Sequence, residues 1–377
     1  MSSILRWWQD AAMSRSTLRP TAVALAVALA IAGCGSSTPS PSPSPTAVAV
    51  ASPSPSPSPS PSPSPSPSPS PEVAYADLDG LPVDPAIAHR LPIAVSIDDA
   101  RAARPQSGFN AASIVYQAPA DGYETRYMFV YQSGDAADVG PVRSSRLYLV
   151  QWAAEYRAAF AHYGGDRQTL TWIKEKSAGL ITNVDALFGS AAAFHRISSR
   201  PKPHNAYTST DDLRAMAARR GGPAELDPTI HRRPFVDESP TSARAASQTI
   251  RIPYRTNVVT YDYDRGANVY LRSVDGKAQT DPADGKRVAT RNVVVLFQSF
   301  RIDVKIEPGH ARPVIGSIGK GDAWVFREGR LTKGTWVKED VGATTRLLDA
   351  SGQEIPLVRG NTFIQVVPTG TKVAVGS

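Results

Sequence analysis

Apolar and polar positions over residues 91–222 follow two periods, as expected for a region that mixes strands and helices. Short apolar runs predict strands at 93–97, 113–117 and 127–131. Apolar residues three or four positions apart form one stripe along 146–160, which predicts a helix. The members of this stripe are Leu149, Trp152, Ala153, Tyr156 and Phe160. The pattern therefore indicates strands that pack against at least one amphipathic helix.

The same region ends in a second helix with a clear start signal. Residues 161–163 predict a short strand, which a Gly-Gly turn follows. Ser209 and Asp212 have the spacing of a capping box ahead of a helix over 213–220, and two glycines end that helix. We therefore expect an N-terminal domain of the α+β or α/β class, with a mixed sheet, over residues 75–222.

From residue 250 onward the period falls to two, which is typical of strands that bury one face. Strand-like runs flank turn signals throughout this part. The runs lie at 258–263, 268–272, 292–300, 323–327, 335–338, 347–349, 354–357 and 362–367. We expect a small all-β C-terminal domain over 250–377, built as a sandwich or half-open barrel. The polar, proline-broken stretch at 223–249 is predicted to be a linker.

The chain begins with a segment that has the features of a lipoprotein signal peptide, predicted over residues 1–33. An eleven-residue apolar run at 21–31 follows basic residues and is too short to span a bilayer stably. The run leads to Ile-Ala-Gly-Cys34, which resembles the lipobox of bacterial lipoproteins. In that class the cysteine sulfur is acylated and Cys34 would be the mature N-terminus. The alternative is an ordinary signal peptide with an incidental cysteine, and either Met1 or Met13 could be the start.

Residues 34–74 are rich in serine and proline and end in ten consecutive Ser-Pro pairs at 52–71. Proline fixes φ and removes a backbone donor, so the composition predicts a disordered, semi-extended tether. At about 3.1 Å per residue, twenty residues would reach on the order of 60 Å. We expect an extracytoplasmic protein, lipid-anchored to the bacterial cell membrane and held away from it by this tether, which could also be glycosylated.

Charge and motifs exclude several classes of function. The net charge is +7, with 41 basic against 34 acidic residues, a mild excess that favours anionic small ligands or surfaces over nucleic acid. The chain has one cysteine, which excludes an internal disulfide framework and a cysteine-based zinc site. Phosphate-binding loops, dinucleotide-binding fingerprints and nucleophile elbows are absent from the sequence.

Basic, acidic and amide residues at the strand ends and loops of the N-terminal domain form the candidate ligand-binding site. The set comprises Arg104, Glu124, Arg126, Arg143, Arg146, Arg196, Arg200, His204 and Asn205. Arg143 and Arg146 stand directly before the helix predicted at 146–160, where guanidinium groups and helix N-terminal amides can hold a phosphate together. We therefore expect an arginine-lined cleft with Arg126, Arg143 and Arg146 as its main clamp. The alternative is that these arginines pair structurally with nearby carboxylates, namely Asp98, Asp99, Glu124 and Glu155.

Asp98, His162 and His204 are the candidate catalytic residues, although the sequence does not decide whether any reaction is catalysed. His162 could be a general base, but a hydrogen-bonded core histidine is the more common case. His162, His195 and His204, with Asp98 or Asp166, could gather around a metal ion. The spacings typical of zinc sites are missing, so no metal site is assigned.

Several short motifs in this order resemble the YerB family of bacterial lipoproteins. The motifs are Pro92-Ile93-Ala94-Val95, Ala103-Arg104-Pro105-Gln106-Ser107-Gly108, Ile114-Val115-Tyr116, Thr125-Arg126, Gly140-Pro141-Val142-Arg143-Ser144-Ser145-Arg146, Gly164-Gly165, Pro203-His204-Asn205-Ala206-Tyr207 and Gly334-Thr335-Trp336-Val337-Lys338. The resemblance covers 91–367 and implies an envelope lipoprotein with an N-terminal domain of unassigned function and a β-rich C-terminal partner. A weaker topological likeness to the LytR–CpsA–Psr phosphotransferases implies arginines that grip a polyprenyl pyrophosphate.

Three hypotheses follow for the function. The first is a protein that binds or transfers an anionic envelope ligand, such as a lipid-linked phosphate or glycopolymer, with Asp98 or Glu124 holding a Mg²⁺ ion if one is needed. The second is a non-catalytic envelope scaffold that binds partner proteins. The third is a metal-dependent hydrolase.

Overall fold

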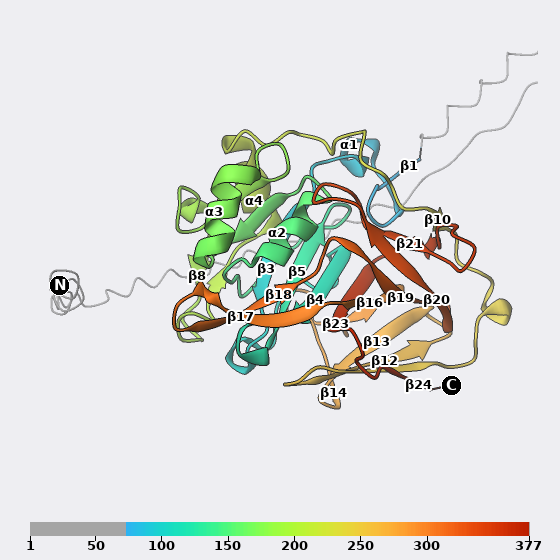
Figure 1. Cartoon of the computed structure of the whole chain (residues 1–377). Coiled ribbons are helices and arrows are strands. Elements are labelled where there is room, and N and C mark those ends of the chain that lie inside the picture. Colours follow the sequence, from blue (N-terminus) through green and yellow to red (C-terminus); the bar gives the residue numbers. More distant parts are fainter. Residues whose placement is uncertain (1–72, 377) are drawn as a thin grey trace, which may run out of the picture. The chain divides into compact units, whose positions relative to one another are not determined.

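The computed structural model describes residues 73–376. A ten-stranded sheet takes its strands from both the N-terminal and the C-terminal part of this range (Figure 1). The signal peptide, Cys34 and the Ser-Pro pairs lie outside the described residues. The N-terminal strands of this sheet are β3 (Ile93–Asp98), β4 (Ile114–Pro119), β5 (Thr125–Tyr131), β6 (Ala159–His162) and β7 (Thr182–Asp185). The C-terminal strands are β16 (Asn292–Gln298), β19 (Gly319–Arg327), β20 (Arg330–Lys338), β21 (Arg346–Leu348) and β23 (Thr362–Pro368).

The sheet has the strand order β21-β20-β19-β16-β23-β4-β5-β3-β6-β7. Strand β5 is antiparallel to both of its neighbours, β3 and β4, whereas β6 and β7 run parallel to β3. The N-terminal part of the sheet is therefore mixed, as expected. The join between the two parts is the parallel pair β23–β4, with Thr362 opposite Ile114 and Gln365 opposite Gln117. The N-terminal α+β region and the β-rich C-terminal region therefore share one sheet.

Helices cover both faces of the N-terminal strands. They are α2 (Leu147–Ala154) and α3 (Arg167–Lys176) on one face and α4 (Thr210–Arg219) on the other, while the short α1 (Pro85–Ala88) contacts β1 (Ala74–Tyr75). Alternate residues of β3 belong to opposite core clusters: Val95 packs in the same cluster as Leu213 of α4, and Ala94 packs in the same cluster as Trp152 of α2. The indole of Trp152 stacks on Tyr116 of β4, with ring centroids 4.9 Å apart. The apolar faces of strands and helices thus form the core that the sequence pattern indicated.

Helix α2 is shorter than predicted. It ends at Ala154, and Phe160 lies in the buried strand β6 instead of on the helical stripe. Arg157 has a φ of 48°, so the chain turns sharply between the helix and the strand. The prediction of a helix to residue 160 was wrong because buried helical and strand residues are both apolar there. Helix α4 begins at Thr210, earlier than the predicted 213, but its cap is as predicted, because the Ser209 hydroxyl accepts the Asp212 amide hydrogen at 3.0 Å.

A second sheet packs on one face of the C-terminal strands. Its strand order is β14-β13-β12-β11-β24, with β15 also paired to β13. The bounds are β11 (Thr249–Pro253), β12 (Val258–Asp264), β13 (Val269–Val274), β14 (Lys277–Ala278), β15 (Ala289–Thr290) and β24 (Ala374–Gly376). Ile250 and Tyr261 of this sheet share a core cluster with Phe363 of β23. The C-terminal region is therefore layered like a sandwich, but one of its layers continues the N-terminal sheet.

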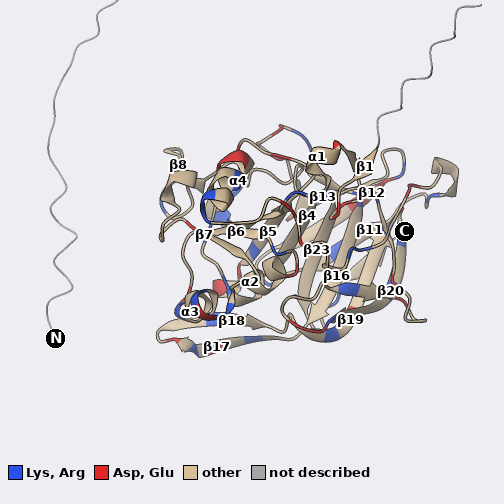
Figure 2. Ribbon diagram, turned by 90° about the horizontal axis from the view of Figure 1, so that it is seen from above, with Lys and Arg blue, Asp and Glu red and all other residues tan. Residues whose placement is uncertain are grey.

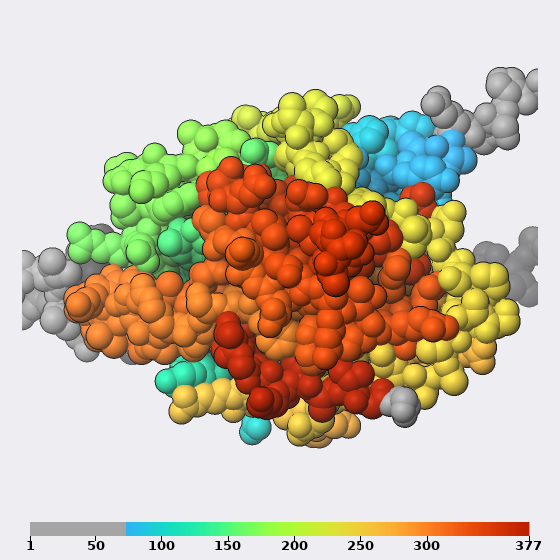
Figure 3. Space-filling view, turned by 45° about the vertical axis from the view of Figure 1, so that its right-hand side comes forward, coloured from blue at the N-terminus to red at the C-terminus, as the bar shows by residue number. Residues whose placement is uncertain are grey.

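A hairpin of β17 (Phe300–Glu307) and β18 (His310–Ile315) leaves the C-terminal part and lies against the N-terminal part (Figure 3). Short pairs complete the fold. They are β1 (Ala74–Tyr75) with β2 (Pro82–Val83), β8 (His195–Arg196) with β9 (Ala206–Tyr207), and β10 (Phe235–Val236) with β22 (Leu357–Val358). Four 3₁₀ turns lie at η1 (Arg101–Ala103), η2 (Asp121–Tyr123), η3 (Ala191–Ala193) and η4 (Thr241–Ala243). None of the helices in the described part is long and apolar enough to cross a membrane.

Candidate functional site

Two polar clusters lie where β3 ends and β5 begins. Asp98, the last residue of β3, is paired with Arg126 near the start of β5. A loop after Gly140 runs beside this end of β3, because the Asp98 amide donates to the Pro141 carbonyl at 2.9 Å and the Arg143 amide donates to the Ser96 carbonyl at 2.8 Å. These two backbone bonds bring Arg143 next to Asp98.

The first cluster is built around the Asp98 carboxylate. His204 Nδ1 lies 2.8 Å from Asp98 Oδ2, and Arg143 Nε lies 3.4 Å from the same oxygen. The Asp98 side chain is only 3% exposed, whereas those of Arg143 and His204 are 28% and 18% exposed. His204 Nε2 makes no hydrogen bond within residues 73–376. The structure therefore joins two of the three candidate catalytic residues, with an imidazole and a guanidinium partly open to solvent.

Asp99, the next residue, is buried and anchors Arg104 beside this cluster. Arg104 Nε donates to Asp99 Oδ1 at 2.9 Å, and the Gln106 amide donates to the same oxygen at 2.8 Å. Burial lowers the pKa of Arg104, but the charge and hydrogen bond of Asp99, together with Tyr127 and Asp275, outweigh it and hold the pKa above its ordinary value. Burial and the charges of Asp99 and Asp98, opposed by Arg104, raise the pKa of the Glu124 carboxyl. Glu124 thus keeps its proton to a higher pH than an isolated glutamate.

The second cluster is built around Asp121 in η2. Arg146 Nε donates to Asp121 Oδ2 at 2.9 Å, and Arg126 Nη2 lies 3.6 Å from that oxygen. Arg312 of β18 donates to Asp121 Oδ1 at 2.9 Å and also binds Glu307. Burial alone would raise the pKa of Asp121, but Arg146 and Arg126 lower it to about 2. Three guanidiniums are therefore held by one ionised carboxylate.

Arg126 and Arg146 are equally buried in the expected clamp, and of these two Arg126 is the one with an unpartnered nitrogen within residues 73–376. Its side chain is 7% exposed, its Nη1 donates to the Ser144 carbonyl at 2.8 Å, and its Nε is buried without a partner among the described residues. Burial, followed by repulsion from Arg146, lowers the pKa of Arg126 to about 10. Arg126 and Arg146 thus face Asp121, and only Arg143 of the three lies at the Asp98 cluster.

The alternative of structural ion pairs accounts for several of these arginines. Asp98 and Asp99 pair with Arg143 and Arg104, as that alternative expected. Glu155 instead pairs with Lys338, 3.4 Å away, and both side chains are fully buried. The sequence did not point to Asp121, the carboxylate that pairs with Arg146. Asp121 precedes a glycine in a turn, a position with no periodic signal, which is why its role was missed.

Arg196, Arg200 and Asn205 shape the loop that presents His204. Arg196 Nη1 donates to Asn205 Oδ1 at 2.6 Å, and the Asn205 amide donates to the Arg200 carbonyl at 3.0 Å. Arg200 fastens the loop to the η1 region through the carbonyls of Ala103 and Pro105, at 2.6 and 2.8 Å. These three predicted ligand residues therefore position the loop through hydrogen bonds within the protein.

His162 lies apart from the Asp98 cluster. It is fully buried, with Nδ1 2.8 Å from the Gly164 carbonyl and Nε2 2.8 Å from Asn183 Oδ1. This is the hydrogen-bonded core histidine that was the alternative to a general base. Within residues 73–376, no three histidine, cysteine, aspartate or glutamate side chains gather as a metal site would require.

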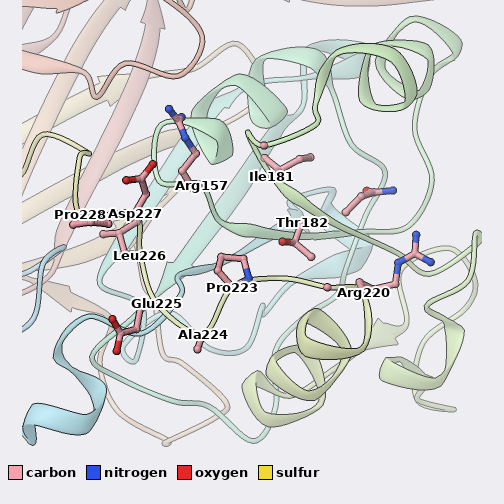
Figure 4. Close-up of a pocket in the computed structure, with 13 residues that line it drawn as sticks. Arg157, Ile181, Thr182, Arg220, Pro223, Ala224, Glu225, Leu226, Asp227 and Pro228 are labelled. Carbon is pink, nitrogen blue, oxygen red and sulfur yellow. The ribbon is translucent and has the colours of Figure 1, made fainter.

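A cavity of about 720 Å³ lies away from both clusters, beside the edge strand β7 (Figure 4). Thr182 of β7 forms one wall, and residues 220–228 form the other. Arg157 and Arg220 line it together with Glu225 and Asp227, so the lining has both signs of charge. Over the whole described ribbon, basic and acidic positions are interleaved as well (Figure 2). The predicted site residues do not line this cavity.

Comparison with known proteins places these features in a family. The model of the N-terminal domain described as "Protein of unknown function (DUF3048)" matches residues 78–223, and that of its C-terminal domain matches residues 250–364. The chain belongs to the DUF3048 family. A curated relative, "Putative lipoprotein YerB" of Bacillus subtilis strain 168, is 32% identical over 306 residues, which cover 78% of this chain and 86% of the relative.

A solved structure has the same fold. The crystal structure of the YerB protein from Bacillus subtilis matches with a TM-score of 0.70 at 30% identity, covering 80% of this chain and 99% of that one. The expected membership of the YerB-like family and the expected fold class are confirmed. The likeness to the LytR–CpsA–Psr phosphotransferases stays a prediction.

Proposed function

We propose that this DUF3048 protein is a lipoprotein of the cell envelope that binds an anionic, phosphate-bearing ligand at the Asp98 cluster. The observation that carries the proposal is the shared carboxylate oxygen: Arg143 and His204 both face Asp98 Oδ2, and both stay partly exposed. One carboxylate neutralises only one positive charge. When His204 is protonated, the cluster has an unbalanced positive charge at its exposed rim, where a phosphate can accept charge-assisted hydrogen bonds.

The membrane attachment is proposed from the sequence and from the relative. The chain carries a lipobox-like Cys34, and its relative is named as a lipoprotein. Lipid-anchored at Cys34 and spaced by the Ser-Pro segment, the folded part would meet ligands at or near the outer face of the cell membrane. A lipid-linked phosphate or a glycopolymer is the ligand class that fits this place.

If the ligand is also transferred, the neutral form of His204 would serve instead of the protonated form. The Asp98 carboxylate would accept a hydrogen bond from His204 Nδ1. The other ring nitrogen, Nε2, would then take a proton from an attacking hydroxyl. Glu124, whose pKa is raised, would donate a proton to a leaving group. Asp98 or Glu124 would supply the oxygen ligand if the phosphate arrives with Mg²⁺.

Charge reversal at Arg143 tests the proposal. Pyrophosphate, with and without Mg²⁺, is titrated calorimetrically into the wild-type protein and the Arg143→Glu variant. We expect the variant to bind at least about tenfold more weakly, because it loses a charge-assisted contact and adds a negative charge.

The matched control is Arg301→Glu, which reverses a side chain that is 63% exposed and pairs with Asp303. This control should bind pyrophosphate like the wild type, and thermal melts should show both variants folded. Equal affinity in wild type and Arg143→Glu would contradict the ligand site and favour an envelope scaffold instead.

A further inference from the structure

A groove of about 520 Å³ lies between the η2 turn, the end of β11 and the residues that follow β23. Its lining is mainly apolar and includes the proline ring of Pro119, the buried ring of Tyr254 and the half-buried ring of Phe300. The volume falls within the range of about 300–1,000 Å³ that is usual for small-molecule sites. The groove is therefore large enough to cover part of an apolar chain.

Two cations stand at this groove without acidic partners. Arg255 and Lys372 both line it and are both exposed, and neither has a carboxylate within 4.0 Å in the part of the chain that the structure describes. The Arg255 guanidinium lies over the ring of Tyr123, 3.6 Å from its centroid. The cationic groups are thus set against an aromatic and apolar surface, with their charges left unpaired.

Tyr123 supplies an independent sign of function. Its φ is 63°, in the left-handed region that bulky residues rarely adopt, and its side chain is 37% exposed. The surrounding loop holds it there, because Thr256 donates to the Tyr123 carbonyl at 3.0 Å and Asn257 donates to the Thr125 hydroxyl at 3.0 Å. Such a conformation is strained, and strained residues are concentrated at binding sites. The hydrogen bonds of the loop thus hold an aromatic ring at the groove in a strained conformation.

We propose that this groove binds an anionic amphiphile, a single prenyl or alkyl chain that ends in a phosphate. The chain would lie against Tyr254 and Phe300, and the phosphate would lie between Arg255 and Lys372. An uncharged lipid would leave both cations unused, and a free anion would leave the apolar lining in water. Only a molecule with both parts matches the whole lining. The proposal goes beyond the Asp98 cluster, because the groove uses none of its residues.

Three probes separate the parts of this ligand: farnesyl phosphate below its aggregation concentration, farnesol and inorganic phosphate. Binding of each to the purified protein is measured by equilibrium dialysis. We expect farnesyl phosphate to bind at least tenfold more tightly than farnesol or phosphate. The double variant Arg255→Glu/Lys372→Glu should lose at least tenfold in affinity for farnesyl phosphate and keep the wild-type affinity for farnesol.

The matched control is Lys277→Glu/Lys320→Glu, which reverses two exposed lysines that also lack carboxylate partners in the described chain and do not line the groove. This control should bind farnesyl phosphate like the wild type. The Arg255→Glu/Lys372→Glu variant should keep the wild-type affinity for pyrophosphate, which the Asp98 cluster is proposed to bind, so failure of the groove and failure of the Asp98 site are distinguishable. Equal affinity for farnesyl phosphate and inorganic phosphate, or unchanged binding in the Arg255→Glu/Lys372→Glu variant, would overturn the proposal.

Discussion

The Asp121 and Asp98 clusters use the same kinds of residue for different ends. In the Asp121 cluster, Arg126 and Arg146 are each 7% exposed and Arg312 is 14% exposed, and all three face one carboxylate. In the Asp98 cluster, the carboxylate is buried but Arg143 is 28% exposed. Burial needs a partner for every charge, and Asp166, 3.8 Å from Arg146, and Glu307, paired with Arg312, supply the remaining carboxylates of the Asp121 cluster. Partial exposure, in contrast, lets a charge remain available. Arg126 and Arg146 therefore have a structural role, whereas Arg143 is a candidate binding residue.

The motif Arg143-Ser144-Ser145-Arg146 shows the division most directly. Its first arginine turns toward Asp98 and its last toward Asp121, although only two residues separate them. Asp121 also binds Arg312 of the β17–β18 hairpin, so this cluster fastens the C-terminal hairpin to the N-terminal region. The Asp121 cluster should therefore control stability, and the Asp98 cluster should control binding.

The largest expected effect is on stability, from Asp121→Asn. The change leaves three guanidiniums without their common counter-ion, and breaking a buried pair costs about 3–5 kcal/mol. Because Asp121 is 24% exposed, we expect a loss of about 3 kcal/mol in the free energy of unfolding, measured with urea. Asp237→Asn, which removes an 86% exposed carboxylate that pairs with Arg359, should cost less than about 1 kcal/mol. Similar losses in both variants would contradict the difference between buried and exposed pairs.

A smaller loss in the free energy of unfolding is expected when the pH is lowered. The pKa of Asp121 is about 2 in the folded protein, below its ordinary value of 3.8. The ionised carboxylate therefore stabilises the fold fully above about pH 4, and this contribution disappears as the pH falls through 2. We expect about 2 kcal/mol of the unfolding free energy to be lost between pH 5 and pH 2 through this group.

A comparison with the Asp121→Asn variant separates the contribution of Asp121 from those of other carboxylates. Glu155 and Asp349 also have lowered pKa values, so the wild type and Asp121→Asn are compared over the same pH range. The stability difference between the two proteins should shrink toward pH 2. A difference that stays constant with pH would show that the Asp121 charge does not stabilise the fold.

The smallest effect is expected from Arg126→Met. Burial already lowers the pKa of Arg126 to about 10, and Asp121 keeps Arg146 and Arg312 when Arg126 is removed. Apolar replacements of buried ions of similar size are often neutral or stabilising. We expect the unfolding free energy to change by less than about 1 kcal/mol in urea titrations. A loss as large as that of Asp121→Asn would mean that the cluster acts as one unit.

Local patterns predicted many of the elements but few of the contacts. The Ser209 cap, the turn between β12 and β13 and the apolar run of β3 lie where expected, because neighbouring residues decide them. The helix predicted to residue 160 failed because the buried strand β6 is as apolar as a helix. The groove at Arg255 was not anticipated, because its lining residues come from separate parts of the chain.

Local patterns were enough to predict the family, the strands β3, β4 and β5, and the cap at Ser209, since these depend on neighbours along the chain. The pairing of β23 with β4 in one sheet, the meeting of His204 with Asp98, and the choice of carboxylate for each arginine became visible in the folded structure alone. Asp121 and Arg312 are 191 positions apart, and no local pattern records such a pair. The physical reason is that ion pairs depend on distances of a few ångströms, which exist only after distant segments have packed together.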